Sequence, residues 1–132
     1  MVLVILLVLA LFVVQTLLPM RFRYLQVKGM GQKLAQSLGP RDDPPPQTKM
    51  GGRAERALAN LQEALPVFLT LALLNLILGS GSLAVAGAWV FFVGRLLYVP
   101  AYLSGITGLR SLVWAASPVG LVMMLIPILS RT

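Results

Sequence analysis

Four long apolar stretches dominate the hydropathy pattern of the chain. They are separated by polar or glycine-rich segments and cover about residues 2–19, 54–79, 83–104 and 109–130. Each is close to the roughly 20 residues that a helix needs to cross the hydrocarbon core of a bilayer. The pattern predicts an all-α membrane protein: a bundle of four transmembrane helices that forms a single domain over residues 1–132.

A long polar connection over about residues 20–53 separates the first two stretches. Eight of the eleven Lys and Arg residues lie between the two spans or just inside the second one: Arg21, Arg23, Lys28, Lys33, Arg41, Lys49, Arg53 and Arg56. The run Pro44–Pro46 and the pair Gly51–Gly52 predict an irregular centre for this connection. Because cytoplasmic loops carry an excess of Lys and Arg, we expect the connection in the cytoplasm and both termini on the other side. In a bacterium, the membrane would be the inner one.

Composition narrows the chemistry further. Apolar residues make up 58% of the chain and charged residues 11%, with a mean hydropathy of +0.85, whereas soluble domains carry about a quarter charged residues. Cysteine and histidine are both absent, which excludes disulfides, a cysteine nucleophile and the usual zinc ligands. No metal site is therefore expected. The net charge of +7 lies mostly beside a span, so anionic lipid headgroups and an anionic ligand are expected partners rather than nucleic acid.

Polar side chains form a stripe at the start of the second span. On a helix, Arg53, Arg56, Asn60 and Glu63 fall within a sector about 80° wide. A membrane helix must turn such a side toward protein or trapped water. A belt of arginines that anchors the helix at the membrane edge is the alternative, but Glu63 lies deeper and gains nothing from headgroups. The stripe therefore predicts a polar site.

The third and fourth spans carry polar residues at the same end. Arg95, Tyr98 and Tyr102 follow one another at offsets of 0, +3 and +7, which places them on one face of a helix. Arg110 and Ser111 open the fourth span, where backbone N–H groups without helical partners favour an anion or a thiolate. An aromatic belt for the tyrosines and a simple cytoplasmic anchor for Arg110 remain the alternatives.

This set of side chains suits an anionic ligand. Arginine binds carboxylates with two parallel hydrogen bonds, while Glu63 and Asn60 provide acceptors for an ammonium or an amide. The matching ligand is a small zwitterionic peptide with more than one carboxylate, although a phosphate compound suits the arginines about as well. A thiol bound beside an arginine would have a lowered pKa and would serve as a nucleophile.

Three motifs carry a resemblance to a known family. The sequence Arg56-Ala-x-x-Asn60-x-x-Glu63-x-x-Pro66-x-Phe68 is followed by Arg95-x-x-Tyr98-x-x-x-Tyr102 and then by Arg110-Ser111. This order resembles the MAPEG family, the membrane-associated proteins of eicosanoid and glutathione metabolism. The resemblance covers about residues 53–115 and the layout of four spans. It implies a homotrimer that binds glutathione between neighbouring subunits near the cytoplasmic face.

The resemblance also implies roles for individual residues. Those expected to bind glutathione are Arg21, Arg53, Arg56, Asn60, Glu63, Arg95, Tyr98 and Tyr102. Arg110 matches an arginine that stabilises the thiolate, and Ser111 matches a serine that acts on the thiol in the prostaglandin synthase branch. That branch also has a loop aspartate, which does not align with Asp42 or Asp43, so specific prostaglandin chemistry is not implied.

Three functions follow as hypotheses. The first is a glutathione-dependent transferase or peroxidase that acts on lipophilic electrophiles or lipid hydroperoxides from the bilayer. The second is a non-catalytic scaffold of the same family that binds lipid or glutathione. The third, a small multidrug transporter, needs a carboxylate in the first span, and residues 2–18 contain none.

Overall fold

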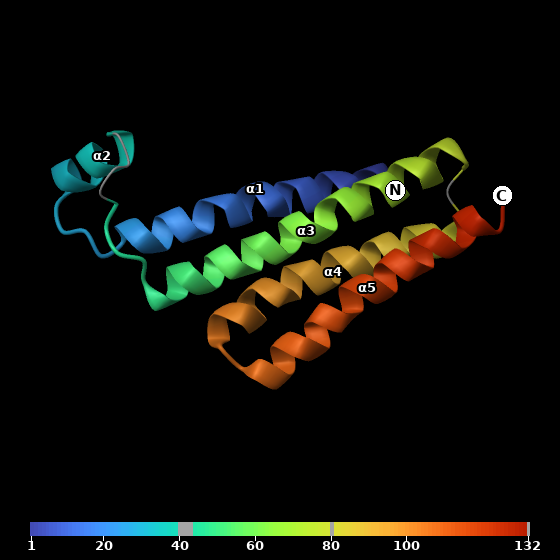
Figure 1. The fold of residues 1–132 in the computed structure, drawn as a ribbon. Coiled ribbons are helices and arrows are strands. Elements are labelled where there is room, and N and C mark those ends of the chain that lie inside the picture. The colour runs from blue at the N-terminus through green and yellow to red at the C-terminus, as the bar shows by residue number, and fades with distance from the viewer. Residues whose placement is uncertain (40–43, 80, 132) are drawn as a thin grey trace.

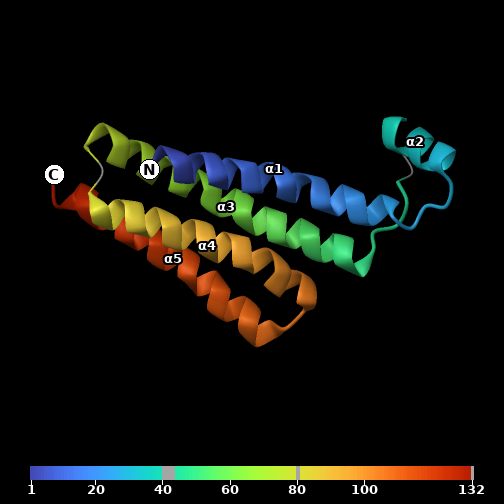
Figure 2. The same cartoon turned by 180° about the vertical axis from the view of Figure 1, so that it is seen from behind.

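The computed structural model describes residues 1–39, 44–79 and 81–131, apart from the side chains of Gln36, Ser37, Thr107, Leu109 and Arg110. Within these residues the chain forms five helices and no strand: α1 (Val2–Tyr24), α2 (Met30–Leu38), α3 (Lys49–Ile77), α4 (Ser82–Ser104) and α5 (Thr107–Leu129). Figure 1 shows α1, α3, α4 and α5 as long helices that run side by side, with the short α2 at one end. The two chain termini lie at the opposite end (Figures 1 and 2).

Among the described residues, four helices are long and apolar enough to cross a membrane, namely α1, α3, α4 and the part of α5 from Ser111 to Leu129. The predicted fold class, an all-α bundle with four membrane-spanning helices, is confirmed. In the bundle α1 packs mainly on α3, and α4 packs mainly on α5, while α3 also contacts both α4 and α5. The end that carries α2 also holds the α4–α5 connection, and we call it the α2 end.

Two helices extend further into the polar connection than the hydropathy pattern predicts. Helix α1 continues through Pro19 to Tyr24, because a proline removes only one hydrogen bond and the helix can resume after it. Helix α3 begins at Lys49 rather than near residue 54. Its first turn is capped by Thr48, whose hydroxyl accepts a hydrogen bond of 2.9 Å from the Gly51 N–H, as is usual for an N-cap threonine.

The polar connection contains one helix that the hydropathy pattern did not predict, while Pro44–Pro46 lie outside any helix. Helix α2 occupies part of it. An ion pair of 3.0 Å between Arg23 of α1 and Glu55 of α3 fastens its two ends. Gln47 donates a hydrogen bond to the same carboxylate, and Gln26 donates one to the Pro46 carbonyl. These contacts hold the start of α3 beside the end of α1.

The core of the bundle is aromatic where α3 meets α4. The rings of Phe68 and Phe91 stack with centroids 4.5 Å apart, and both side chains are fully buried. Such stacked pairs add to the stabilisation that burial gives. Nearby, the buried Asn75 amide donates a hydrogen bond of 2.8 Å to the Met124 carbonyl, which joins α3 to α5. The core therefore fixes α3 against both α4 and α5.

Glycines allow α4 and α5 to approach closely. A Cβ atom added to Gly120 would lie 2.6 Å from the Gly87 carbonyl oxygen and 2.7 Å from the Phe91 nitrogen. Small residues at membrane-helix interfaces permit such backbone contact, which van der Waals packing then stabilises. The pairing of α4 with α5 therefore depends on Gly87 and Gly120.

We expect Gly120→Ala to lower the melting temperature of the detergent-solubilised protein, because the new methyl group meets backbone atoms that cannot move aside. Overpacking of this kind costs about 1–3 kcal/mol. Gly108→Ala is the matched control, since a Cβ at Gly108 on the same helix meets nothing within 4 Å. Equal melting temperatures for the two variants would show that the close α4–α5 contact does not stabilise the bundle.

Candidate polar site at the α2 end

Arg95 is a buried cation inside the bundle. The residue is 4% exposed, and its Nη1 atom donates a hydrogen bond to Oδ1 of Asn60. The guanidinium carbon lies 5.3 Å from the Phe91 ring centroid and 5.9 Å from that of Tyr98. Among the described residues, Nε of Arg95 has no hydrogen-bond partner. A buried guanidinium in a membrane helix is costly unless an anion balances it, so this arrangement favours an anionic ligand.

Glu63 is a carboxylate that interacts with this cation through charge. Its own side chain is exposed at the surface of the single chain. Glu63 and Arg95 do not form a salt bridge. Among the described residues, the only salt bridge joins Arg23 to Glu55. Arg95 is therefore held by an amide and two aromatic rings.

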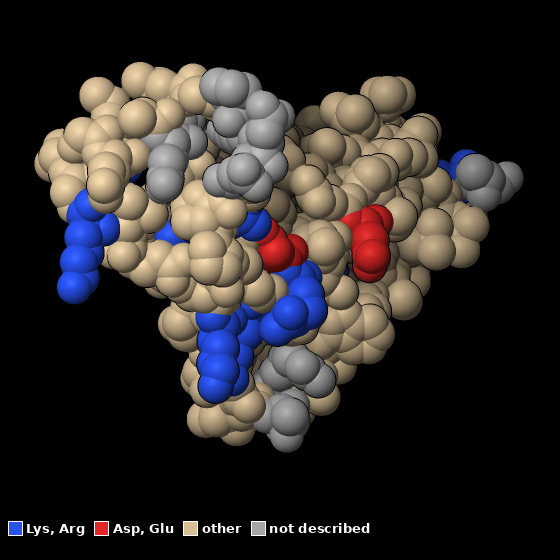
Figure 3. Space-filling view, turned by 60° about the vertical axis from the view of Figure 1, so that its left-hand side comes forward, with Lys and Arg blue, Asp and Glu red and all other residues tan. Residues whose placement is uncertain are grey.

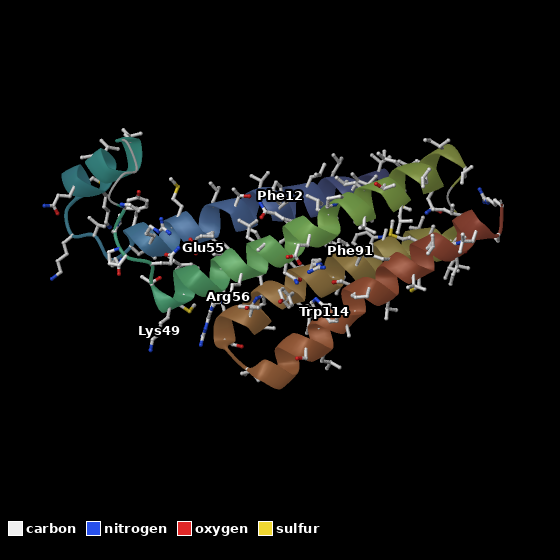
Figure 4. The ribbon with its side chains drawn as sticks, in the orientation of Figure 1. Phe12, Lys49, Glu55, Arg56, Phe91 and Trp114 are labelled. Carbon is white, nitrogen blue, oxygen red and sulfur yellow. The ribbon has the colours of Figure 1, made fainter. Side chains whose placement is uncertain are left out.

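A second arginine is held by a tyrosine. Nε of Arg56 donates a hydrogen bond of 3.2 Å to the Tyr102 hydroxyl, which joins α3 to α4. The Arg56 guanidinium also lies 5.9 Å from the centroid of that ring, within the range of a cation–π contact. Tyr102 in turn packs on Tyr98, with ring centroids 5.4 Å apart. Figure 4 shows Arg56 near the start of α3, on the side of the α4–α5 hairpin.

A cavity of about 560 Å³ lies between three helices at this end. It is lined by Asn60 of α3, Tyr98 and Tyr102 of α4, and Ser111, Trp114 and Ala115 of α5. We call this space the polar cavity. Its volume falls within the range of small-molecule sites, which join apolar walls with a few convergent polar groups. The cavity thus brings together four residues that the sequence predicted for the site: Asn60, Tyr98, Tyr102 and Ser111.

Trp114 is a cavity residue that the sequence analysis did not select. It follows Ser111 by three residues on α5, so the two side chains occupy the same face of the helix. That spacing was the available signal, but a tryptophan in an apolar span more often indicates packing or the membrane interface.

Tyr98 is a predicted site residue that the structure buries inside the bundle. It is 5% exposed, which does not fit a place in an aromatic belt at the membrane surface.

Arg53 has a different environment from its neighbours on the stripe. Its Nη1 atom donates a hydrogen bond of 2.7 Å to the Leu103 carbonyl, in the last turn of α4. Carbonyls at the end of a helix lack intrahelical partners and attract cations. Gly105, with a φ of +79°, ends α4 directly beside the Arg53 guanidinium. Arg53 therefore stabilises the end of α4, and its predicted contact with glutathione stays a prediction.

We expect Arg53→Ala to lower the melting temperature, because the Leu103 carbonyl would lose a charge-assisted hydrogen bond that is typically worth about 1.5–3 kcal/mol. Lys49→Ala is the control, because it removes a positive charge from the exposed start of the same helix. A melting temperature that falls equally in both variants would assign the effect to charge alone.

The structure does not bring the remaining predicted residues to the polar cavity. Arg21 lines a separate groove between α1 and α2. Glu63 faces outward. The side chain of Arg110 lies outside the described part of the structure, as do Asp42 and Asp43. Roles for these residues in binding or catalysis stay predictions.

Positive charge gathers at the α2 end. Figure 3 views this end and shows Lys and Arg side chains grouped on it, with few acidic ones among them. An open groove of about 550 Å³ at the start of α3 is lined by Lys49, Arg53 and Arg56 together with Glu55 and uncharged residues. Among the described residues, no group of three or more acidic side chains lies close enough to hold a metal ion. The positive charge of this end favours an anion.

Comparison with known protein families identifies the chain. The family model described as "MAPEG family" matches residues 1–130 of the 132 residues. The chain belongs to the MAPEG family. No curated protein and no solved structure matches it significantly. Membership in the MAPEG family, together with four helices of spanning length, makes this protein an integral multi-pass membrane protein.

Proposed function

We propose that this MAPEG protein is a glutathione-dependent transferase or peroxidase that acts on lipophilic electrophiles or lipid hydroperoxides. The polar cavity carries the proposal, because three membrane helices contribute an amide, two phenols and a hydroxyl to a space of about 560 Å³. Arg95 and Arg56 lie directly against its lining through Asn60 and Tyr102. Family membership supports glutathione-related or eicosanoid chemistry.

Glutathione matches the charges around the cavity. It carries two carboxylates, one ammonium and one thiol, so it needs cations, one anion and a means to hold the sulfur. Arg56 and Arg95 would bind the carboxylates through paired charge-assisted hydrogen bonds. The unpartnered Nε of Arg95 provides one such donor. Glu63, exposed within reach of the Arg95 charge, would accept the ammonium group.

The beginning of α5 would position the sulfur. Ser111 lines the cavity, and Arg110 precedes it in the sequence. A guanidinium beside a thiol lowers the thiol pKa and raises the fraction of nucleophilic thiolate. In the transferase reaction the thiolate attacks an electrophilic carbon, a C–S bond forms, and the leaving group departs with the bonding electrons. In the peroxidase reaction two glutathione molecules become one disulfide while a hydroperoxide becomes an alcohol and water.

Assembly into a homotrimer belongs to the same proposal. Glu63 lies about four turns inside α3 and is exposed on the surface of the single chain, where lipid would be a costly neighbour for a carboxylate. A neighbouring protomer would cover it and close the polar cavity from outside. Arg21, on α1 of that neighbour, would then come within reach of the ligand. By the charge distribution of the connection we place the α2 end in the cytoplasm.

Turnover by the purified protein in lipid nanodiscs tests the proposal. With glutathione present, we expect saturable conjugation of 1-chloro-2,4-dinitrobenzene or saturable reduction of cumene hydroperoxide. Nanodiscs without protein correct for the spontaneous reaction. Saturable glutathione binding with neither activity would support the non-catalytic scaffold instead. Absence of both binding and turnover would overturn the glutathione proposal altogether.

A further inference from the structure

A second groove lies at the α2 end, apart from the polar cavity. It has a volume of about 430 Å³ and shares no lining residue with that cavity. Its α1 side includes Leu17, Met20 and Arg21, and its α2 side consists of Met30, Lys33 and Leu34. Leu17 and Met20 belong to the apolar part of α1, and Arg21 follows them toward the polar end of the helix. The groove therefore runs from the membrane interior to its surface.

Helix α2 exposes an apolar stripe beside this groove. Met30, Leu34 and Leu38 follow one another at intervals of four residues, so they share one face of the helix. They are 82%, 57% and 77% exposed, respectively. Gly29, with a φ of +93°, makes the turn that brings α2 back beside α1. A short helix with such a face is typical of the membrane interface, where the apolar side enters the acyl-chain boundary.

The charge of the groove is positive. Arg21 and Lys33 stand on opposite walls, one from α1 and one from α2, and none of the described residues that line the groove is acidic. Basic groups beside a membrane span attract anionic lipid headgroups, with each contributing about 1 kcal/mol. Apolar walls that continue into a basic rim match a lipid with a negative headgroup.

We propose that the α1–α2 groove binds an anionic phospholipid, with the phosphate between Arg21 and Lys33 and an acyl chain along Leu17, Met20 and Leu34. This lipid would fasten α2 to the membrane surface and fix the connection between α1 and α3. The site stands independently of the proposed glutathione chemistry. Arg21 is also a predicted glutathione ligand, so the test uses Lys33 and Leu34, which have no such assignment.

Native mass spectrometry of the full-length protein in mild detergent, titrated with phosphatidylglycerol and with phosphatidylcholine, tests the site. We expect phosphatidylglycerol to bind several-fold more tightly to the wild type. Lys33→Gln should weaken phosphatidylglycerol binding about fivefold and leave phosphatidylcholine binding unchanged. Lys28→Gln removes the same charge from outside the groove lining and should have little effect. Leu34→Gln should weaken the binding of both lipids. Equal melting temperatures of the lipid-free variants establish that each is folded.

Four results would overturn the proposal. Equal affinity of the wild type for the two lipids would remove the headgroup preference. Equal losses in Lys33→Gln and Lys28→Gln would assign the effect to diffuse charge rather than to a site. Displacement of the lipid by millimolar inorganic phosphate would indicate a site for a free anion. A change of oligomeric state in Leu34→Gln without a change in lipid binding would assign the stripe to protein–protein contact.

Discussion

Replacing Arg95 with leucine is expected to lower the affinity for glutathione by about 100-fold, the effect of two charge-assisted hydrogen bonds at about 1.5 kcal/mol each. Arg95 is buried and has one nitrogen without a partner among the described residues, so in the proposed site this nitrogen would donate to a carboxylate of the ligand. Isothermal titration calorimetry of the purified protein with glutathione measures the change. Leucine is smaller than arginine and fits the space that the Arg95 side chain occupies. Asn60, however, loses the hydrogen bond that Arg95 donates.

Two further variants make this result interpretable. Arg95→Lys keeps the charge but loses the planar fork that binds a carboxylate with two bonds, so we expect an intermediate affinity. Arg131→Leu removes an arginine at the opposite end of the bundle, where it contacts the Leu78 carbonyl, and should bind glutathione as the wild type does. If Arg95→Leu remains folded and keeps wild-type affinity, Arg95 has no part in the site.

Arg110→Ala is expected to lower turnover by about 100- to 1000-fold, the usual effect of removing one group that stabilises developing negative charge. Glutathione affinity should change little, because in the proposed site Arg56 and Arg95 would bind the carboxylates. The ultraviolet absorbance of bound thiolate, measured as a difference spectrum, should also decrease, because the thiol pKa rises without the adjacent cation.

The adjacent Ser111→Ala variant provides the matched comparison for Arg110. It removes a cavity-lining hydroxyl from the next position on the same helix, without changing charge. A thiolate absorbance that persists in Arg110→Ala but disappears in Ser111→Ala would transfer activation of the thiol to the serine. Equal turnover of Arg110→Ala and wild type would exclude the arginine from the mechanism.

Hydropathy alone was sufficient to predict the four long helices, because a membrane span must be both helical and continuously apolar. Helix ends were less well predicted. The start of α3 at Lys49 depends on the Thr48 cap, which is a local contact within the first turn. The part of α1 after Pro19 is joined to α3 by the Arg23–Glu55 ion pair, which is a tertiary contact. Helix α2 was missed, because the prolines and glycines around it indicated irregular structure while its apolar stripe contains only three residues.

The sequence predicted the candidate site as groups of polar residues that share a helix face. In the structure, residues of one group have different surroundings. Helical spacing places Arg53, Asn60 and Glu63 on one stripe, but it does not say where α4 crosses that stripe. In the structure Asn60 accepts a hydrogen bond from Arg95 of α4, and Arg53 donates one to the Leu103 carbonyl of α4. Glu63 is exposed. Only packing between helices decides which polar residue faces a cavity, a backbone carbonyl or the outside of the bundle.

A structure of the protein with glutathione bound would show whether polar groups of α3, α4 and α5 form one site for this ligand. We expect glutathione in the polar cavity, with its carboxylates on Arg56 and Arg95 and its sulfur beside the beginning of α5. Glutathione bound elsewhere, with the polar cavity filled by lipid and the two arginines directed to headgroups, would contradict it.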